Sequence, residues 1–108
     1  MKYALLAYSR GEASGEREMH PAIAAVLERP EVTGWLRLQP AESATTVTSE
    51  ALLIDGPFID SKEFLGGLIL IDAENLDGAL AVAAELQALD FTAAIEVRPM
   101  FEQELGGA

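Results

Sequence analysis

The sequence predicts one α+β domain in which two helices cover one face of an antiparallel sheet. Three observations lead to this prediction. Apolar runs of strand length alternate with two stretches in which apolar residues recur at helical spacing. The chain has 108 residues, half of them apolar, which is enough for one buried core and too few for a second domain. It has no cysteine, so neither disulfides nor thiolate metal sites supply its stability.

Charge and hydropathy narrow the classes of function. Eighteen acidic and seven basic residues give a formal net charge of −11, which repels phosphate backbones and anionic lipid headgroups. We therefore expect no nucleic acid and no membrane among the partners. No apolar run approaches the ~20 residues of a membrane-spanning helix, and no signal peptide is expected at the start. Together with the absence of cysteine, this leads us to expect a cytoplasmic protein.

The first forty residues predict a strand, a helix and a second strand. Residues 2–8 form an aromatic-rich apolar run, which is typical of a strand buried on both faces. In residues 19–27, apolar side chains recur with the spacing of one helix face. Pro21 suits the first turn of this helix and Pro30 ends it. Residues 35–39 alternate in the manner of a strand and stop before a proline.

The middle of the chain predicts a hairpin followed by a strand. Two β-prone runs, residues 45–48 and 51–55, flank the short connection Ser49-Glu50. This connection lacks the glycine that favoured hairpin turns carry. Residues 66–71 open with two glycines and continue with branched apolar residues, which predicts a strand covered on both faces.

A second helix and a last strand complete the order of elements. Asn75 is a suitable N-cap, and residues 76–86 show the apolar stripe of an amphipathic helix. Residues 93–98 alternate and stop at Pro99, which leaves an acidic tail at 100–108 beyond the domain of residues 1–99. Without the hairpin the order is βαββαβ, which predicts a ferredoxin-like fold with both helices on one face of an antiparallel sheet.

The other face of this sheet predicts self-association. Two helices cover one face only, yet residues 3–8 and 68–71 are apolar at successive positions. Packing against the same face of a second copy removes this apolar surface from water, so we expect a homodimer. The alternative is a monomer in which one apolar face is partly exposed.

Several motifs resemble those of the YCII-related, DGPF-domain family. The resemblance is carried by the opening Met-Lys-Tyr-Ala-Leu-Leu and by residues 55–58 (Asp-Gly-Pro-Phe), 61–67, 71–80 and 95–99. The spacing between Asp-Gly-Pro-Phe and the Leu-Gly-Gly of residues 65–67 is specific. The chain departs from the family pattern at residues 9–40, where the first helix region is short and a common glycine-rich run is missing. Ligand contacts supplied by that segment in the family are therefore not carried over.

The resemblance implies a dimeric α+β barrel. In this architecture the sheets of two ferredoxin-like subunits face each other around a cavity, as in muconolactone isomerases and small monooxygenases. Most members of the family are uncharacterised. Some relatives have been proposed to be enzymes with an Asp and His pair, and DGPF members often accompany alternative sigma factors.

Two ionisable residues are candidates for catalysis. Asp55 precedes a Gly-Pro turn, and if that turn faces a cavity, loss of water favours the protonated carboxyl and allows proton transfer. Alternatively, its carboxylate accepts hydrogen bonds from backbone N–H groups and holds the turn. His20 is the only histidine, and it either joins Asp55 or is a surface residue that caps the first helix.

Four residues are candidates for ligand binding. Glu96 and Arg98 share a face of the last strand and point towards the dimer side if its apolar residues pack on the helices. They then either bind a polar ligand or form an intersubunit ion pair. The guanidinium of Arg37 suits stacking or a carboxylate. Tyr3 and Tyr8 lie on opposite faces of the first strand, so at most one faces the cavity, and we choose Tyr8.

Two classes of function remain open. One is a non-catalytic dimeric module that binds a small ligand or a protein partner, including a partner in sigma-factor regulation. The alternative is a cofactor-free isomerase- or lyase-like enzyme that uses Asp55, with or without His20, for proton transfer on a small organic substrate. We expect no cofactor and no metal, because one histidine without cysteine makes no cluster of strong ligands and no phosphate- or dinucleotide-binding motif is present.

Overall fold

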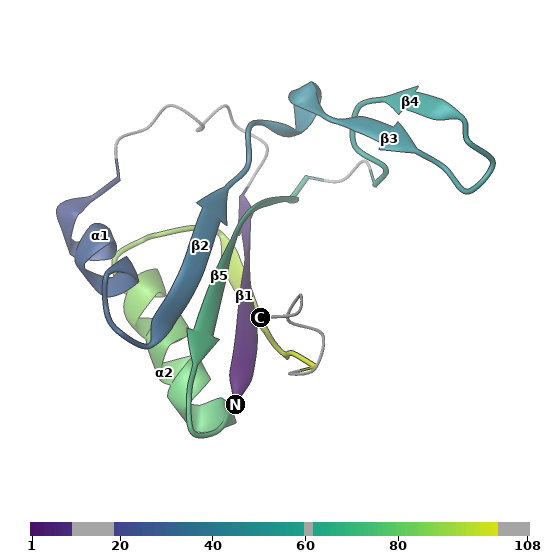
Figure 1. The fold of residues 1–108 in the computed structure, drawn as a ribbon. Coiled ribbons are helices and arrows are strands. Elements are labelled where there is room, and N and C mark those ends of the chain that lie inside the picture. The colour runs from purple at the N-terminus through teal and green to yellow at the C-terminus, as the bar shows by residue number, and fades with distance from the viewer. Residues whose placement is uncertain (10–18, 60–61, 102–108) are drawn as a thin grey trace.

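The computed structural model of the chain describes residues 1–9, 19–59 and 62–101. Four strands form an antiparallel sheet in the order β2-β5-β1-β6 (Figure 1). Their bounds are β1 (Lys2–Ser9), β2 (Val32–Arg37), β5 (Phe64–Asp72) and β6 (Ala94–Pro99). Helices α1 (Pro21–Leu27) and α2 (Leu76–Gln87) lie against one face of this sheet. The predicted ferredoxin-like α+β fold is confirmed.

Local side chains determine where both helices begin. The Nδ1 atom of His20 accepts a hydrogen bond from the N–H of Ala22 at 3.0 Å, ahead of a proline whose missing N–H costs nothing in the first turn. In α2 the side chain of Asn75 accepts a hydrogen bond from the N–H of Gly78 at 3.0 Å, which confirms the predicted N-cap.

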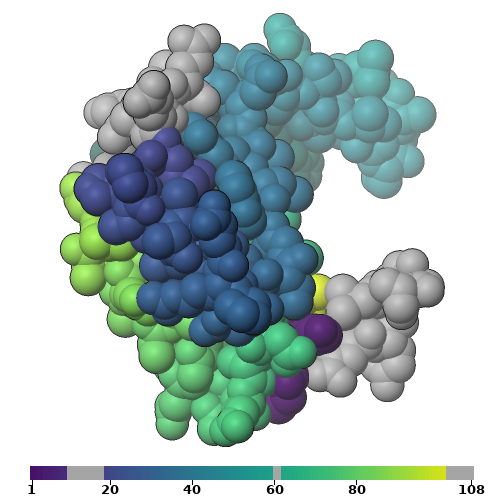
Figure 2. All heavy atoms as spheres, turned by 60° about the vertical axis from the view of Figure 1, so that its left-hand side comes forward, coloured from purple at the N-terminus to yellow at the C-terminus, as the bar shows by residue number. Residues whose placement is uncertain are grey.

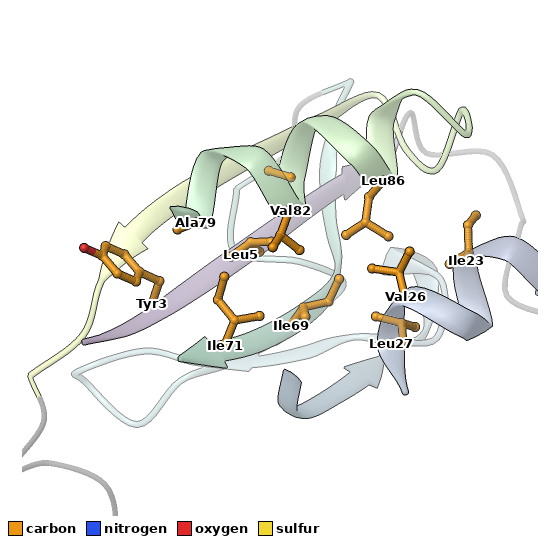
Figure 3. Packing of buried hydrophobic residues seen from close by; sticks show 11 residues of the cluster. Tyr3, Leu5, Ile23, Val26, Leu27, Ile69, Ile71, Ala79, Val82 and Leu86 are labelled. Atoms are coloured by element: carbon orange, nitrogen blue, oxygen red, sulfur yellow. The ribbon is translucent and has the colours of Figure 1, made fainter. Parts of the chain in front are cut away.

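The core lies between the two helices and one face of the sheet. Figure 3 shows side chains from β1, β5 and both helices pointing into one layer. The buried cluster in the described part of the chain consists of Tyr3, Leu5, Ile23, Val26, Leu27, Ile69, Ile71, Ala79, Val82, Ala83 and Leu86. Burial of each large apolar side chain stabilises the fold by about 1.5–3 kcal/mol, so this single cluster supplies most of the driving force.

Alternation along the central strands separates two faces of the sheet. Leu5 of β1 lies opposite Ile69 on one neighbouring strand and Val97 on the other, and all three face the helices. The next residue, Leu6, lies opposite Leu68, and this pair points away from the helices. The two central strands are therefore apolar on both faces, as predicted.

Strand β2 is displaced from its predicted position. The sequence predicts a strand at 35–39, whereas β2 spans Val32–Arg37. A bulge separates Val32, which lies opposite Ile71, from Gly34, which lies opposite Leu70. The predicted bounds are wrong because the partner strand β5 extends far enough to pair with this segment, and a strand boundary set by a partner is not visible locally.

The predicted hairpin forms a separate two-stranded sheet of β3 (Thr45–Val47) and β4 (Leu53–Asp55), and its connection, residues 48–52, is longer than the predicted Ser49-Glu50. It follows one turn of 3-10 helix, η1 (Ala41–Ser43), which was not predicted. In the connection, the N–H of Ala51 donates to the carbonyl of Thr48 at 2.9 Å, and Ala51 adopts a φ of 63°, which glycine usually supplies in such a turn. The hairpin extends beyond the sheet on the side away from the helices (Figure 1), and Figure 2 shows it standing clear of the body.

The predicted tail begins as an extension of the sheet edge. The N–H of Met100 donates to the carbonyl of Lys2 at 2.9 Å, beyond the last residue of β6. Residues 102–108 of the predicted tail lie outside the described residues. Within the described ranges, no helix is long and apolar enough to cross a membrane.

Candidate functional site

The sheet face that points away from the helices is largely apolar, and we call it the open face. Neither helix lies on this side of the sheet (Figure 1). Its apolar side chains are Ala4, Leu6 and Tyr8 of β1, Leu36 of β2, and Leu68 and Leu70 of β5. Each of them is partly or fully exposed, in contrast to their neighbours on the core face. The open face is thus an apolar surface that one chain leaves in contact with water.

Two hollows meet at Tyr8, near the end of β1. The larger, of about 590 Å³, lies between the sheet and the base of the hairpin. Its lining includes apolar Leu38, Ile59 and Phe64 and polar Gln39, Ser43 and Glu63. The smaller, of about 470 Å³, is lined by Tyr8, Lys62, Glu63, Ala94, Ile95 and Glu96. Tyr8 and Glu63 belong to both hollows, so together these form one continuous candidate site.

The position of Tyr8 is held by its backbone. Its carbonyl accepts hydrogen bonds from the hydroxyl of Thr92 and from the N–H of Ala93, the latter at 3.1 Å. In the described part of the chain the phenolic hydroxyl has no hydrogen-bond partner. Tyr3, by contrast, is 2% exposed in the core, so of the two tyrosines only Tyr8 lies at the candidate site. This arrangement leaves the Tyr8 hydroxyl available to a ligand.

Glu96 and Arg98 lie on the open face, where the register of β6 against β1 places them opposite Leu6 and Ala4. Two guanidinium nitrogens of Arg98 donate to Oε2 of Glu96, with Nε at 2.9 Å. Both side chains are exposed. The sequence predicted a ligand contact or an intersubunit ion pair, and the structure shows that the two groups already neutralise each other within one chain.

Arg37 lies on the other side of the sheet from these groups. It is opposite Gly67, and its neighbour Trp35 is opposite Ile69, so both share the face on which the helices pack. The structure does not bring Arg37 together with Tyr8, and we leave it out of the candidate site.

Asp55 and His20 are not neighbours within one chain. Asp55 ends β4 on the hairpin, and His20 precedes α1, which lies on the opposite side of the sheet (Figure 1). The Asp55 carboxylate is exposed and makes no hydrogen bond in the part of the chain that the structure describes, so it does not hold the turn in the expected way. His20 has the structural role given as its alternative, since its Nδ1 caps α1.

Backbone geometry holds the Asp-Gly-Pro-Phe turn in place of the Asp55 side chain. Gly56 has a φ of 111°, which residues with a Cβ rarely adopt. Its N–H donates to the carbonyl of Ala44 at 2.8 Å, and its carbonyl accepts from the hydroxyl of Thr46 at 2.9 Å. The turn therefore connects the base of the hairpin to the chain segment that lines the larger hollow.

Sequence reasoning missed the polar residues Gln39, Ser43 and Glu63. Ser43 ends η1, a three-residue turn without any periodic pattern, and Gln39 lies two residues before that turn begins. The local signal for Glu63 was its position directly before the apolar strand β5. Among the described residues no group of three or more acidic or histidine side chains is arranged to hold a metal ion.

Comparison with known proteins identifies the family. The family model of the YCII-related domain matches residues 1–103, which is nearly the whole chain. The chain belongs to the YCII-related domain family. It is also similar to an uncharacterized protein of Rhizobium meliloti (strain 1021), with 43% identity over 68 residues. That match covers 59% of this chain and 55% of the relative, so the chain spans about half the length of the relative that it matches. The resemblance seen in the sequence is confirmed.

Proposed function

We propose that this YCII-related domain forms a homodimer that binds a small organic ligand at the Tyr8 end of the open face. The observation that carries the proposal is the position of Tyr8. It stands where two hollows meet, on an apolar sheet face, with a hydroxyl that has no partner among the described residues. Concave, mostly apolar sites with a few convergent polar groups are the usual form of small-molecule sites.

The open face supports the dimer. Leu6 and Leu68 form a cross-strand apolar pair at its centre, and neither helix covers them. A face-to-face arrangement of two sheets buries this surface and closes the open side of both hollows. The dimer thereby turns two shallow hollows into the kind of enclosed space that a small ligand needs.

The lining indicates the class of ligand. Leu38, Ile59 and Phe64 favour an apolar body, while the Tyr8 hydroxyl and Ser43 offer hydrogen bonds to one polar group. Lys62 and Glu63 in the lining carry opposite charges, and the net charge of −11 disfavours anions. We propose a neutral, largely apolar molecule with one hydrogen-bonding group.

The proposal is tested with benzyl alcohol, an aromatic ring with one hydroxyl group, as the probe. Binding is measured from shifts in the amide spectrum, and the mass of the protein is measured by light scattering. We expect a mass of twice 11.5 kDa and shifts centred on Tyr8. Tyr8→Phe should weaken binding about fivefold, the effect of one lost hydrogen bond, whereas the core variant Tyr3→Phe should bind as the parent does. Equal affinity in Tyr8→Phe, or shifts far from Tyr8, would overturn the site.

Proton transfer by Asp55 is the second candidate function. It is favoured by the exposed Asp55 carboxylate, which makes no hydrogen bond within the described residues and is therefore available to a substrate. The proposal rests on Asp55 and not on His20, because the Nδ1 of His20 is occupied in the helix cap. In a substrate survey, Asp55→Asn should remove any turnover while the mass of the dimer stays the same. Turnover that survives in Asp55→Asn removes the residue from the mechanism.

A further inference from the structure

We propose that the hairpin of each copy reaches across to a second copy and packs against it, which brings Asp55 into the site between the subunits. We call residues 44–59 the arm. The inference rests on the proposed dimer and adds to it which segment crosses and which residue crosses with it. The occupant of the arm's apolar surface is thus a second copy of this chain.

The arm is unusually apolar for a segment in contact with water. Its exposed apolar side chains are Val47, Leu52, Leu53, Ile54, Phe58 and Ile59. Each exposes between 40% and 73% of its area. Together they present on the order of 700 Å², divided between the two faces of the hairpin, against the ~800 Å² that each partner contributes to a stable interface.

The arm does not cover this surface with its own chain. Figure 2 shows the arm standing clear of the body, with the molecule hollowed beside it. Its internal hydrogen bonds, including Gly56 N–H to the carbonyl of Ala44 and Thr48 N–H to the carbonyl of Leu52, keep it extended as a hairpin. The arm and the open face project to the same side of the sheet (Figure 1), so two copies related by a two-fold axis can each cover the arm of the other.

The charges on the open face suit a second copy. The chain carries a net charge of −11, so two copies repel each other over most of their surfaces. The open face is different, because Arg98 is paired with Glu96 and Lys2 is paired with Asp72 at its far end. A surface whose charges are already neutralised does not oppose association with an equally acidic molecule.

The register of the arm determines which of its side chains reach the partner together. Val47 lies opposite Leu53, and Thr45 lies opposite Asp55, and these two pairs share one face of the hairpin. Packing of Val47 and Leu53 against the partner therefore carries the Asp55 carboxylate to the edge of the same interface. The single chain leaves this carboxylate in water, whereas the proposed dimer places it at the interface between the subunits.

The absence of cysteine makes the arm directly testable. A spin label is attached at the arm tip in Ser49→Cys, and this chain is mixed with isotope-labelled chain that carries no spin label. After exchange of subunits, we expect the amide signals of Leu6 and Leu68 in the isotope-labelled copy to be lost through broadening. The matched control places the label in Leu80→Cys on the exposed surface of α2, which should leave these signals intact.

The outcomes separate this inference from the proposed dimer. A dimer by light scattering in which Leu6 and Leu68 keep their signals with the Ser49→Cys label overturns the arm and leaves the dimer standing. A mass of 11.5 kDa overturns both. A second variant, Val47→Ser with Leu53→Ser, changes exposed residues only and should raise the dimer dissociation constant at least about tenfold, since both faces of a two-fold interface lose apolar contact. An unchanged dissociation constant contradicts the arm.

Discussion

The guanidinium of Arg29, just after α1, makes two parallel hydrogen bonds to the carboxylate of Glu85 in α2, with Nη1 at 2.7 Å from Oε2. This pair joins the two helices on the outside of the core. The hydrogen bond from Arg29 holds the pKa of Glu85 below its ordinary value of 4.5, and the same bond raises the pKa of Arg29. Both side chains are partly exposed, so water screens the interaction.

The Glu85 pair predicts a pH dependence of stability. Because the pKa of Glu85 is lower in the folded chain than in the unfolded chain, its stabilising contribution is complete above pH 4.5 and is lost as the pH falls through the lowered value. Glu85→Gln should therefore have a slightly lower Tm than the parent at pH 7, and the difference should disappear in acid. Glu42→Gln removes the same charge elsewhere and serves as the control. A difference in Tm that grows in acid would contradict the argument.

The role of His20 as the N-cap of α1 can be tested by substitution. Its Nδ1 accepts the hydrogen bond from Ala22 N–H, so His20→Ala should destabilise the fold by about 1 kcal/mol in chemical denaturation. His20→Asn keeps an acceptor at the N-cap and should retain most of the stability. A His20→Ala variant as stable as the parent would show that the cap contributes nothing.

Gly67 is required where β5 meets β2. A Cβ at this position would lie 2.8 Å from the carbonyl oxygen of Leu36, and this contact is with backbone that has no freedom to move aside. Gly67→Ala should therefore destabilise the fold by about 1–3 kcal/mol, because the two strands must separate. Gly34→Ala is the matched control in the adjacent strand, since a Cβ there meets nothing within 4 Å. Equal losses from both substitutions would contradict the close approach as the cause.

A charge at Leu6, on the open face, should prevent the proposed dimer from forming. Leu6→Asp places a carboxylate at the centre of the proposed interface, where two copies would bury it without a partner. We expect this variant to have the mass of one chain by light scattering at concentrations where the parent is a dimer. Leu80→Asp, on the exposed surface of α2, should keep the parent's mass. Dimers of Leu6→Asp at parental affinity would place the interface elsewhere.

Much of the fold follows from patterns within short segments. The apolar stripe of α2 and its cap at Asn75 depend on residues a few positions apart, and the structure has them where they were predicted. The run 68–71 was apolar on both faces in the sequence, and the structure divides it between the core and the open face. These features are local because helix and strand periodicities are properties of neighbouring residues.

The residues of the candidate site could be predicted from the sequence less directly than the fold. The alternation of one strand put Tyr3 and Tyr8 on opposite faces without deciding between them, and the structure places Tyr8 at both hollows. Arg37 was chosen by residue type alone, and only its pairing with Gly67 shows that it lies on the other face. Ser43 carried no pattern, and the strand alternation that included Gln39 did not indicate a hollow, because a lining residue is defined by what lies across the hollow.

The amino-acid sequence by itself determined the order of the elements, their caps, the family and the presence of an apolar surface that two helices do not cover. Only the tertiary structure decided that β2 begins at Val32, that His20 and Asp55 lie apart, and that the hairpin stands away from the body with its apolar side chains in water. The physical reason is the distance along the sequence over which each kind of interaction acts. Periodicity and capping depend on residues within a turn or two, whereas strand ends, shared faces and hollows depend on which distant segments pair.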